Sequence, residues 1–101
     1  MQNLKKISNE ELKNILELHK KWLNNEEGGK RADLSYTDLS YADLGGTNLN
    51  NADLTKALLE NTSFNNANLT NAILKGTNIE IKGTNIETNK EIPKKTNIER
   101  D

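Results

Sequence analysis

The central half of the chain repeats with a period of five residues. Large apolar residues occupy ten consecutive positions of this repeat: Leu34, Leu39, Leu44, Leu49, Leu54, Leu59, Phe64, Leu69, Leu74 and Ile79. Five steps of about 100° rotate each repeat by about 140° around an α-helix, so these residues cannot share one helical face. An odd spacing also sends successive side chains to opposite faces of a flat strand. The repeat therefore predicts a chain that bends once per pentad, which is a solenoid.

Two other positions of the pentad fit this prediction. Only Ala or Thr stands two residues before each of these central positions, so each pentad would supply one large and one small inward side chain. Such a narrow core suits a chain with 33% hydrophobic residues. The bend predicts a positive φ two residues after the centre, where Gly and Asn are tolerated best. Six corners carry these residues: Gly46, Asn51, Asn61, Asn66, Asn71 and Gly76.

The pattern of Ala or Thr, Asp or Asn, Leu or Phe, and two variable residues resembles the pentapeptide-repeat family over residues 32–81. The resemblance implies a right-handed quadrilateral β-helix with about twenty residues per coil. We therefore predict an all-β solenoid of about two and a half to three coils with an N-terminal α-helix cap. Residues 1–31 would form the capping helix and a linker, and residues 82–101 an irregular last coil and tail, all within one structural domain.

A helix is predicted from about Asn9 to about Asn25. Ser8 and Glu11 form a capping box, and Gly28 and Gly29 follow as a stop signal. One stripe of the helix carries the following residues: Leu12, Ile15, Leu16, His19, Trp22 and Leu23. Because the first coil of a solenoid exposes unpaired backbone, we expect this stripe to cover it. The alternative is a helix that docks on another protein.

Composition excludes several classes of function. The chain has no Cys and one His, which removes thiolate nucleophiles and the usual sets of metal-ligating side chains. Asp33 and Asp53 would lie in one column, but a hard cation needs about six oxygens, so no metal is assigned. We predict no catalytic residue, no cofactor and no enzyme activity. No apolar stretch approaches the roughly 20 residues of a membrane span, and a cytoplasmic protein is expected.

Charge and aromatic residues indicate where a partner would bind. Residues 32–55 contain four Asp and no basic residue, which disfavours direct binding to nucleic acid. A candidate interaction patch combines the two Tyr with neighbouring acids: Tyr36, Tyr41, Asp33, Asp38 and Asp43. The alternative is that both Tyr merely cover the corners of the coil. A second apolar set, Leu58, Ile73 and Ile81, is a candidate self-association face of a monomer or weak dimer.

The function predicted from these features is a non-enzymatic structural or protein-interaction module with an unidentified protein partner. The alternative is a modulator of DNA gyrase, because quinolone-resistance members of the family are similar to a DNA duplex in shape and charge. Residues 32–81 carry six acidic residues and two Lys. Since B-DNA presents one charge per about 1.7 Å, this segment is too short and insufficiently acidic for that role.

Overall fold

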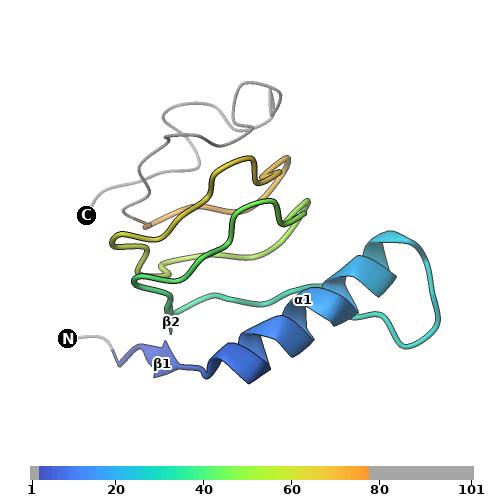
Figure 1. The fold of residues 1–101 in the computed structure, drawn as a ribbon, viewed down its shortest axis with the longest axis horizontal. Helices are drawn as coiled ribbons and strands as arrows, with labels where there is room; N and C mark the ends of the chain where they lie inside the picture. Colours follow the sequence, from blue (N-terminus) through green and yellow to red (C-terminus); the bar gives the residue numbers. More distant parts are fainter. Residues whose placement is uncertain (1–2, 78–101) are drawn as a thin grey trace.

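The computed structural model describes residues 3–77, which form a helix beside a stack of short chain segments (Figure 1). The strand β1 spans Lys5–Lys6, the helix α1 spans Asn9–Leu23, and the strand β2 spans Thr37–Asp38. In Figure 1, α1 lies along one end of the stack, and successive segments rise away from it. The fold is therefore a solenoid with a helix at its N-terminal end.

Parallel backbone pairs define the turns of this solenoid. They join residues that lie twenty positions apart: Asp33 with Asp53, Asp38 with Leu58, Asp43 with Ser63, Asn48 with Asn68, and Asp53 with Ile73. This step confirms four pentads per coil. Residues 32–51 form the first coil and residues 52–71 the second, and a third coil begins at Ala72. The predicted irregular coil and tail, residues 82–101, lie outside the described residues.

The core consists of the central residues of the pentads, as the five-residue period predicts. Every central side chain from Leu34 to Leu74 is at most 4% exposed, and most of the small residues two positions earlier are buried as well. Where Thr replaces Ala, its hydroxyl donates to a carbonyl: from Thr47 to Leu44 at 2.7 Å and from Thr77 to Leu74 at 2.8 Å. A buried hydroxyl that is hydrogen-bonded carries little desolvation cost, so Thr fits an inward position. Ile79 lies outside the described residues.

This inward assignment predicts a contrast between two neighbouring residues. Phe64 is 3% exposed, whereas Asn65 is exposed. Phe64→Ala should lower the free energy of unfolding by about 3–5 kcal/mol because it leaves a cavity in a thin core. Asn65→Ala should change it by less than about 0.5 kcal/mol. Urea denaturation of both variants measures the difference, and a larger loss from Asn65→Ala would contradict the inward assignment.

The corners are more uniform than the sequence predicts. All six predicted Gly and Asn corners have positive φ, between 56° and 77°. Three corners with other residues adopt the same conformation: Tyr36 at 54°, Tyr41 at 66° and Lys56 at 57°. Because each coil must turn by the same amount at each corner to stay in register, the solenoid imposes the left-handed conformation even where the residue disfavours it.

The helix begins as predicted and ends two residues earlier. The capping box is present, with the Glu11 N–H donating to Ser8 Oγ at 3.0 Å. At the other end Asn25 has a φ of 59°, and the Glu26 N–H donates to the Lys21 carbonyl at 2.8 Å, which is a Schellman ending. Asn25 therefore stops the helix, not the predicted glycines. Gly29 has a different role, because a Cβ there would collide with the backbone of Trp22.

Two elements cover the N-terminal edge of the first coil. Leu12 of α1 belongs to the same apolar cluster as the central leucines, with Ile15 and Leu16 packed against it. The strand β1, which the sequence does not predict, pairs in parallel with β2, and the Lys5 N–H donates to the Tyr36 carbonyl at 2.8 Å. Within residues 3–77, no helix is long and apolar enough to cross a membrane.

Candidate functional site

The three aspartates of the predicted patch stand directly before the central leucines of the first coil. In each, a carboxylate oxygen accepts from the backbone N–H two residues ahead: Asp33 from Ser35 at 3.1 Å, Asp38 from Ser40 at 3.0 Å, and Asp43 from Gly45 at 3.0 Å. This bond satisfies a backbone donor inside the turn. The carboxylates of the patch therefore already have a structural task.

The same bond recurs at the equivalent positions of other pentads. Asn48, Asp53 and Asn68 each accept from the N–H two residues ahead, at 3.0–3.1 Å. The common requirement is an acceptor oxygen on Cγ, two bonds from Cβ, which Asp and Asn supply. In the sequence, the preference for Asp or Asn directly before the central residue was the signal of this hydrogen bond. The sequence analysis noted the preference but did not assign it this structural role. At Leu58 and Ile73 the turn forms without such a bond.

The tyrosines lie at the first two corners of the first coil. Tyr36 is 44% exposed and Tyr41 is 74% exposed, although both have the left-handed backbone conformation. A residue other than Gly held in this conformation costs on the order of 1 kcal/mol or more. Because most of the Tyr41 side chain is exposed, burial of its ring does little to offset that cost. The structure thus places both rings on the surface, in a conformation that Asn would adopt more easily.

The strand β1 changes the charge of the patch. It brings Lys5 and Lys6 beside the first coil. There the positive charge of Lys5 lowers the pKa of Asp33, and that of Lys6 lowers the pKa of Asp38. The pKa of Asp33 is below its ordinary value, first because of hydrogen bonds from Ser35 and to a smaller extent because of the positive charges of Lys5 and Arg31. Residues 32–55 contain no basic residue, but the fold brings Lys5 near Asp33 and Lys6 near Asp38.

His19 connects the helix to the first coil. Its side chain is fully buried, and both ring nitrogens have backbone partners. The Ala32 N–H donates to Nδ1 at 2.9 Å, and Nε2 lies 2.9 Å from the Asn50 carbonyl oxygen. Arg31 adds a nearby contact, with Nε donating to the Asn51 carbonyl at 2.6 Å. His19 is thus a boundary residue of the helix, as its place on the apolar stripe predicted.

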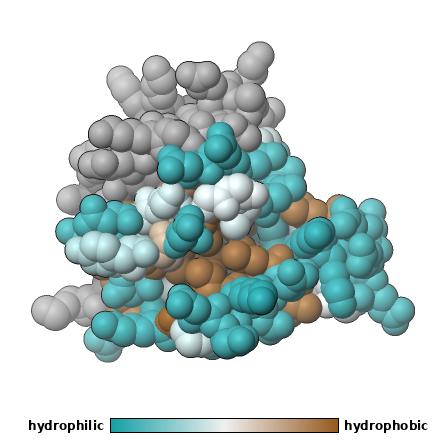
Figure 2. Space-filling model, in the orientation of Figure 1, coloured by the Kyte–Doolittle hydropathy of each residue, from teal (hydrophilic) through white to brown (hydrophobic). Residues whose placement is uncertain are grey.

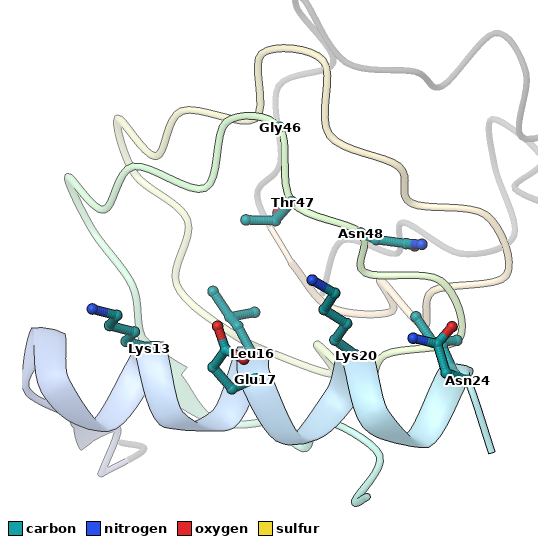
Figure 3. A pocket seen from close by; sticks show the side chains of 9 residues that line it. Lys13, Leu16, Glu17, Lys20, Asn24, Gly46, Thr47 and Asn48 are labelled. Atoms are coloured by element: carbon teal, nitrogen blue, oxygen red, sulfur yellow. The ribbon is translucent and has the colours of Figure 1, made fainter. Parts of the chain in front are cut away.

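A groove separates α1 from the exposed edge of the first coil. It encloses about 480 Å³ between Lys13, Leu16 and Lys20 of the helix and the segment 46–48 of the coil (Figure 3). A second hollow of about 410 Å³ shares Lys13 and Leu16 with it and reaches Tyr41. Figure 2 shows hydrophobic surface between the helix and the coils on this face. The predicted patch therefore borders a partly apolar groove.

The charges of the groove and the second hollow balance when the two are taken together. Lys13 and Lys20 point into the groove from the helix, and Glu17 stands between them in Figure 3. Asp43 adds a second carboxylate in the second hollow, which reaches Tyr41. Two cations and two anions give no preference for an acidic or a basic ligand.

Comparison with known proteins identifies the family. A family model for pentapeptide repeats matches residues 30–51 and 47–80, in eight copies. The matched region covers half of the chain. The chain belongs to the pentapeptide-repeat family. The β-helix resemblance drawn from the pentads is thereby confirmed at the level of the family.

A solved structure is similar to this pentapeptide-repeat protein. It is the pentapeptide repeat protein Rfr23 from the cyanobacterium Cyanothece 51142, with 39% sequence identity and a TM-score of 0.50. The similarity covers 68% of this chain and 44% of the Rfr23 chain, so this chain spans less than half of the length of that one. A search of the curated proteins found no match.

The second apolar set is not brought together on one face of this pentapeptide-repeat protein. Leu58 pairs with Asp38, whereas Ile73 pairs with Asp53, so the two residues lie on different sides of the solenoid. Leu58 is half-buried and Ile73 is 37% exposed. Ile81 lies outside the described residues.

The described part of the chain contains no group of three or more His, Cys, Asp or Glu residues that could hold a metal ion. Asp33 and Asp53 lie in one column, as predicted, because their backbones pair between the first and second coils. The Asp33 Oδ1 also accepts the Ser35 hydroxyl at 2.6 Å, and the Asp53 Oδ1 accepts the Thr55 hydroxyl at 2.6 Å. Each carboxylate is thus oriented toward its own turn.

Proposed function

We propose that this pentapeptide-repeat protein is a non-enzymatic protein-interaction module that binds its partner through the first-coil patch. The patch consists of Tyr36, Tyr41, Asp33, Asp38 and Asp43. The observation that carries the proposal is the conformation of the two tyrosines. Both stand at corners where Asn or Gly would cost less, and Tyr41 remains 74% exposed there. Strained residues that persist on a surface are typical of binding sites.

The chemistry of the patch suits a protein partner. Exposed tyrosine rings supply rigid contact area with a hydroxyl that can hydrogen-bond, and Tyr is enriched where binding energy concentrates. The groove beside Tyr41 offers an adjoining apolar surface. Lys5 and Lys6 reduce the acidity of the patch, so the rings supply more of the selectivity than charge does. No feature of residues 3–77 favours the gyrase alternative, since these cations interrupt the acidic run.

A double substitution tests the proposal. Tyr36→Asn with Tyr41→Asn keeps the corner geometry, because Asn occupies equivalent corners at positive φ. The melting temperature should stay the same or rise, while binding to the partner should be lost. Quantitative capture from cells of the source, compared between the wild-type and variant chains, measures binding. A modest decrease of capture between about 0.1 and 0.2 M salt is also expected, because charged groups flank the rings.

A matched control uses the third unusual corner. Lys56→Asn makes the same kind of corner replacement on the second coil, outside the patch. This variant should capture the same proteins as the wild-type chain. Equal capture by a folded double-Tyr variant, or no protein retained by the wild-type chain, would make the proposal wrong. Unfolding of the double-Tyr variant would show that the rings are structural.

A further inference from the structure

His19 is the one histidine of the chain, and it is completely enclosed between α1 and the first coil. Its two ring nitrogens face backbone groups of different kinds. Nδ1 faces the Ala32 N–H, which is a donor, and Nε2 faces the Asn50 carbonyl, which is an acceptor, both at 2.9 Å. Ala32 begins the first coil, and Asn50 stands near its end. One ring therefore holds the helix to both ends of the first coil.

These partners fix the protonation state of the ring. Nδ1 must be unprotonated to accept from Ala32, so Nε2 carries the hydrogen and donates to Asn50. A second proton could be added only at Nδ1. There it would face the Ala32 N–H, and two donors cannot bond to each other. The ring would then lose one of its two bonds and place a positive charge in a buried site.

Within residues 3–77, no carboxylate is among the groups that act on the ring, so the positive charge would have no ion-pair partner there. From the coil side, the charged group that acts on His19 is Arg31, which is a cation as well. On the helix, the neighbouring titratable residue is Lys20, which is exposed and points into the groove. At the edge of the first coil the ring meets Asn50, which does not titrate. Trp22 stacks on the ring, with 5.6 Å between centroids and an interplanar angle of 19°.

We propose that His19 is a proton-operated latch: protonation of its ring releases α1 from the first coil. Release would uncover the buried edge of the solenoid beneath the helix. The device consists of the contact that His19 of α1 makes with Ala32 and Asn50 of the first coil. Acid thus converts a covered solenoid end into an open one.

The difference between the His19 pKa in the docked and the undocked chain gives the direction in which pH changes the docking of α1. Burial lowers the pKa of His19 below its ordinary value of 6.5, while the Asn50 carbonyl opposes and Arg31 reinforces this change. An unfolded or undocked chain therefore binds the proton more tightly than the docked one. The docking equilibrium should be at its full strength above about pH 6.5 and weaken as the pH falls below it. Because one group titrates, the loss is at most tenfold per pH unit.

The wild-type chain itself provides the first measurement. Trp22 is the one tryptophan, so its emission reports the stacked pair, and NMR follows the His19 ring and the Ala32 amide in the same samples. Between pH 7.5 and 5, Trp22 emission should change, and hydrogen exchange of the Ala32 amide should become faster than the pH alone requires. A His19 ring that titrates near its ordinary value without any change at Ala32 would overturn the proposal.

A non-titrating replacement provides the control. His19→Gln keeps one acceptor and one donor, so it can still bond to Ala32 and Asn50 but cannot gain a proton in this range. This variant should show no change of Trp22 emission or Ala32 exchange between pH 7.5 and 5. If the folded variant keeps the wild-type pH dependence, the latch is elsewhere and the proposal is wrong. If the variant does not fold, the hydrogen exchange of the Ala32 amide in the wild-type chain tests the proposal, and exchange that follows the pH alone makes it wrong.

Discussion

Leu54→Ala should lower the free energy of unfolding by about 2–5 kcal/mol, the largest effect of any single truncation among the leucines. Leu54 is the middle member of a buried column, with Leu34 before it and Leu74 after it, and all three are 0% exposed. The two neighbours are held by backbone pairing and cannot move in to fill the space. Since small domains are stable by only about 5–15 kcal/mol, much of the reserve would be lost.

The same substitution at another leucine is the control. Leu58 stands outside the column, half-buried, at the position where most pentads have Asp or Asn. Leu58→Ala should change the free energy of unfolding by less than about 1 kcal/mol. Urea denaturation of both variants gives the comparison. Equal midpoints for Leu54→Ala and the wild-type chain would contradict the twenty-residue register.

Removal of residues 1–27 should convert the protein into an unfolded or aggregating chain. The truncation removes Leu12, Ile15 and Leu16, which pack on the first layer of the core, and also removes β1 and His19. The first layer would then face water along an open edge of paired segments, which is a template for association. Size-exclusion chromatography and circular dichroism measure the outcome.

A shorter truncation is the control for the loss of chain length, because it leaves α1 and β1 on the first coil. Removal of residues 1–3 keeps β1 and α1 intact and should leave a monomer with unchanged circular dichroism. If the 1–27 truncation also stays monomeric with an unchanged β-type spectrum, the helix does not protect the first coil. In that case α1 is a partner-docking element, and the 37% exposed Trp22 becomes the next residue to test.

The period of the repeat was sufficient to predict most of the fold. It specified which side chains point inward, because a side chain's direction depends on its place within the pentad. The columns follow once four pentads close a coil, and that number came from the resemblance to the pentapeptide-repeat family. The start of α1 was equally predictable, because Ser8 and Glu11 bond to backbone groups three residues away. These features are local, or they repeat a local rule.

The candidate site was less predictable. Sequence reasoning selected Tyr36 and Tyr41 as exposed corner residues, and the structure places both on the surface. The bend predicted a positive φ at the corners, but only Gly and Asn corners were counted as fitting; Tyr disfavours that conformation, and the closure of the coil imposes it at Tyr36 and Tyr41. Sequence reasoning also missed Lys5 and Lys6 near the aspartates, since a two-residue strand carries almost no signal of its own.

The sequence by itself thus determined the solenoid and its inward positions, because both depend on contacts repeated every five residues, and the resemblance to the family supplied the twenty-residue register that the backbone pairs show. Only the tertiary structure decided what happens at the N-terminal end of the solenoid. There β1 pairs with a segment about thirty residues ahead, and His19 meets both Ala32 and Asn50. These contacts occur once, between partners far apart in the chain, so the five-residue repeat does not predict them. They are set by how the helix and the first coil fit together in space.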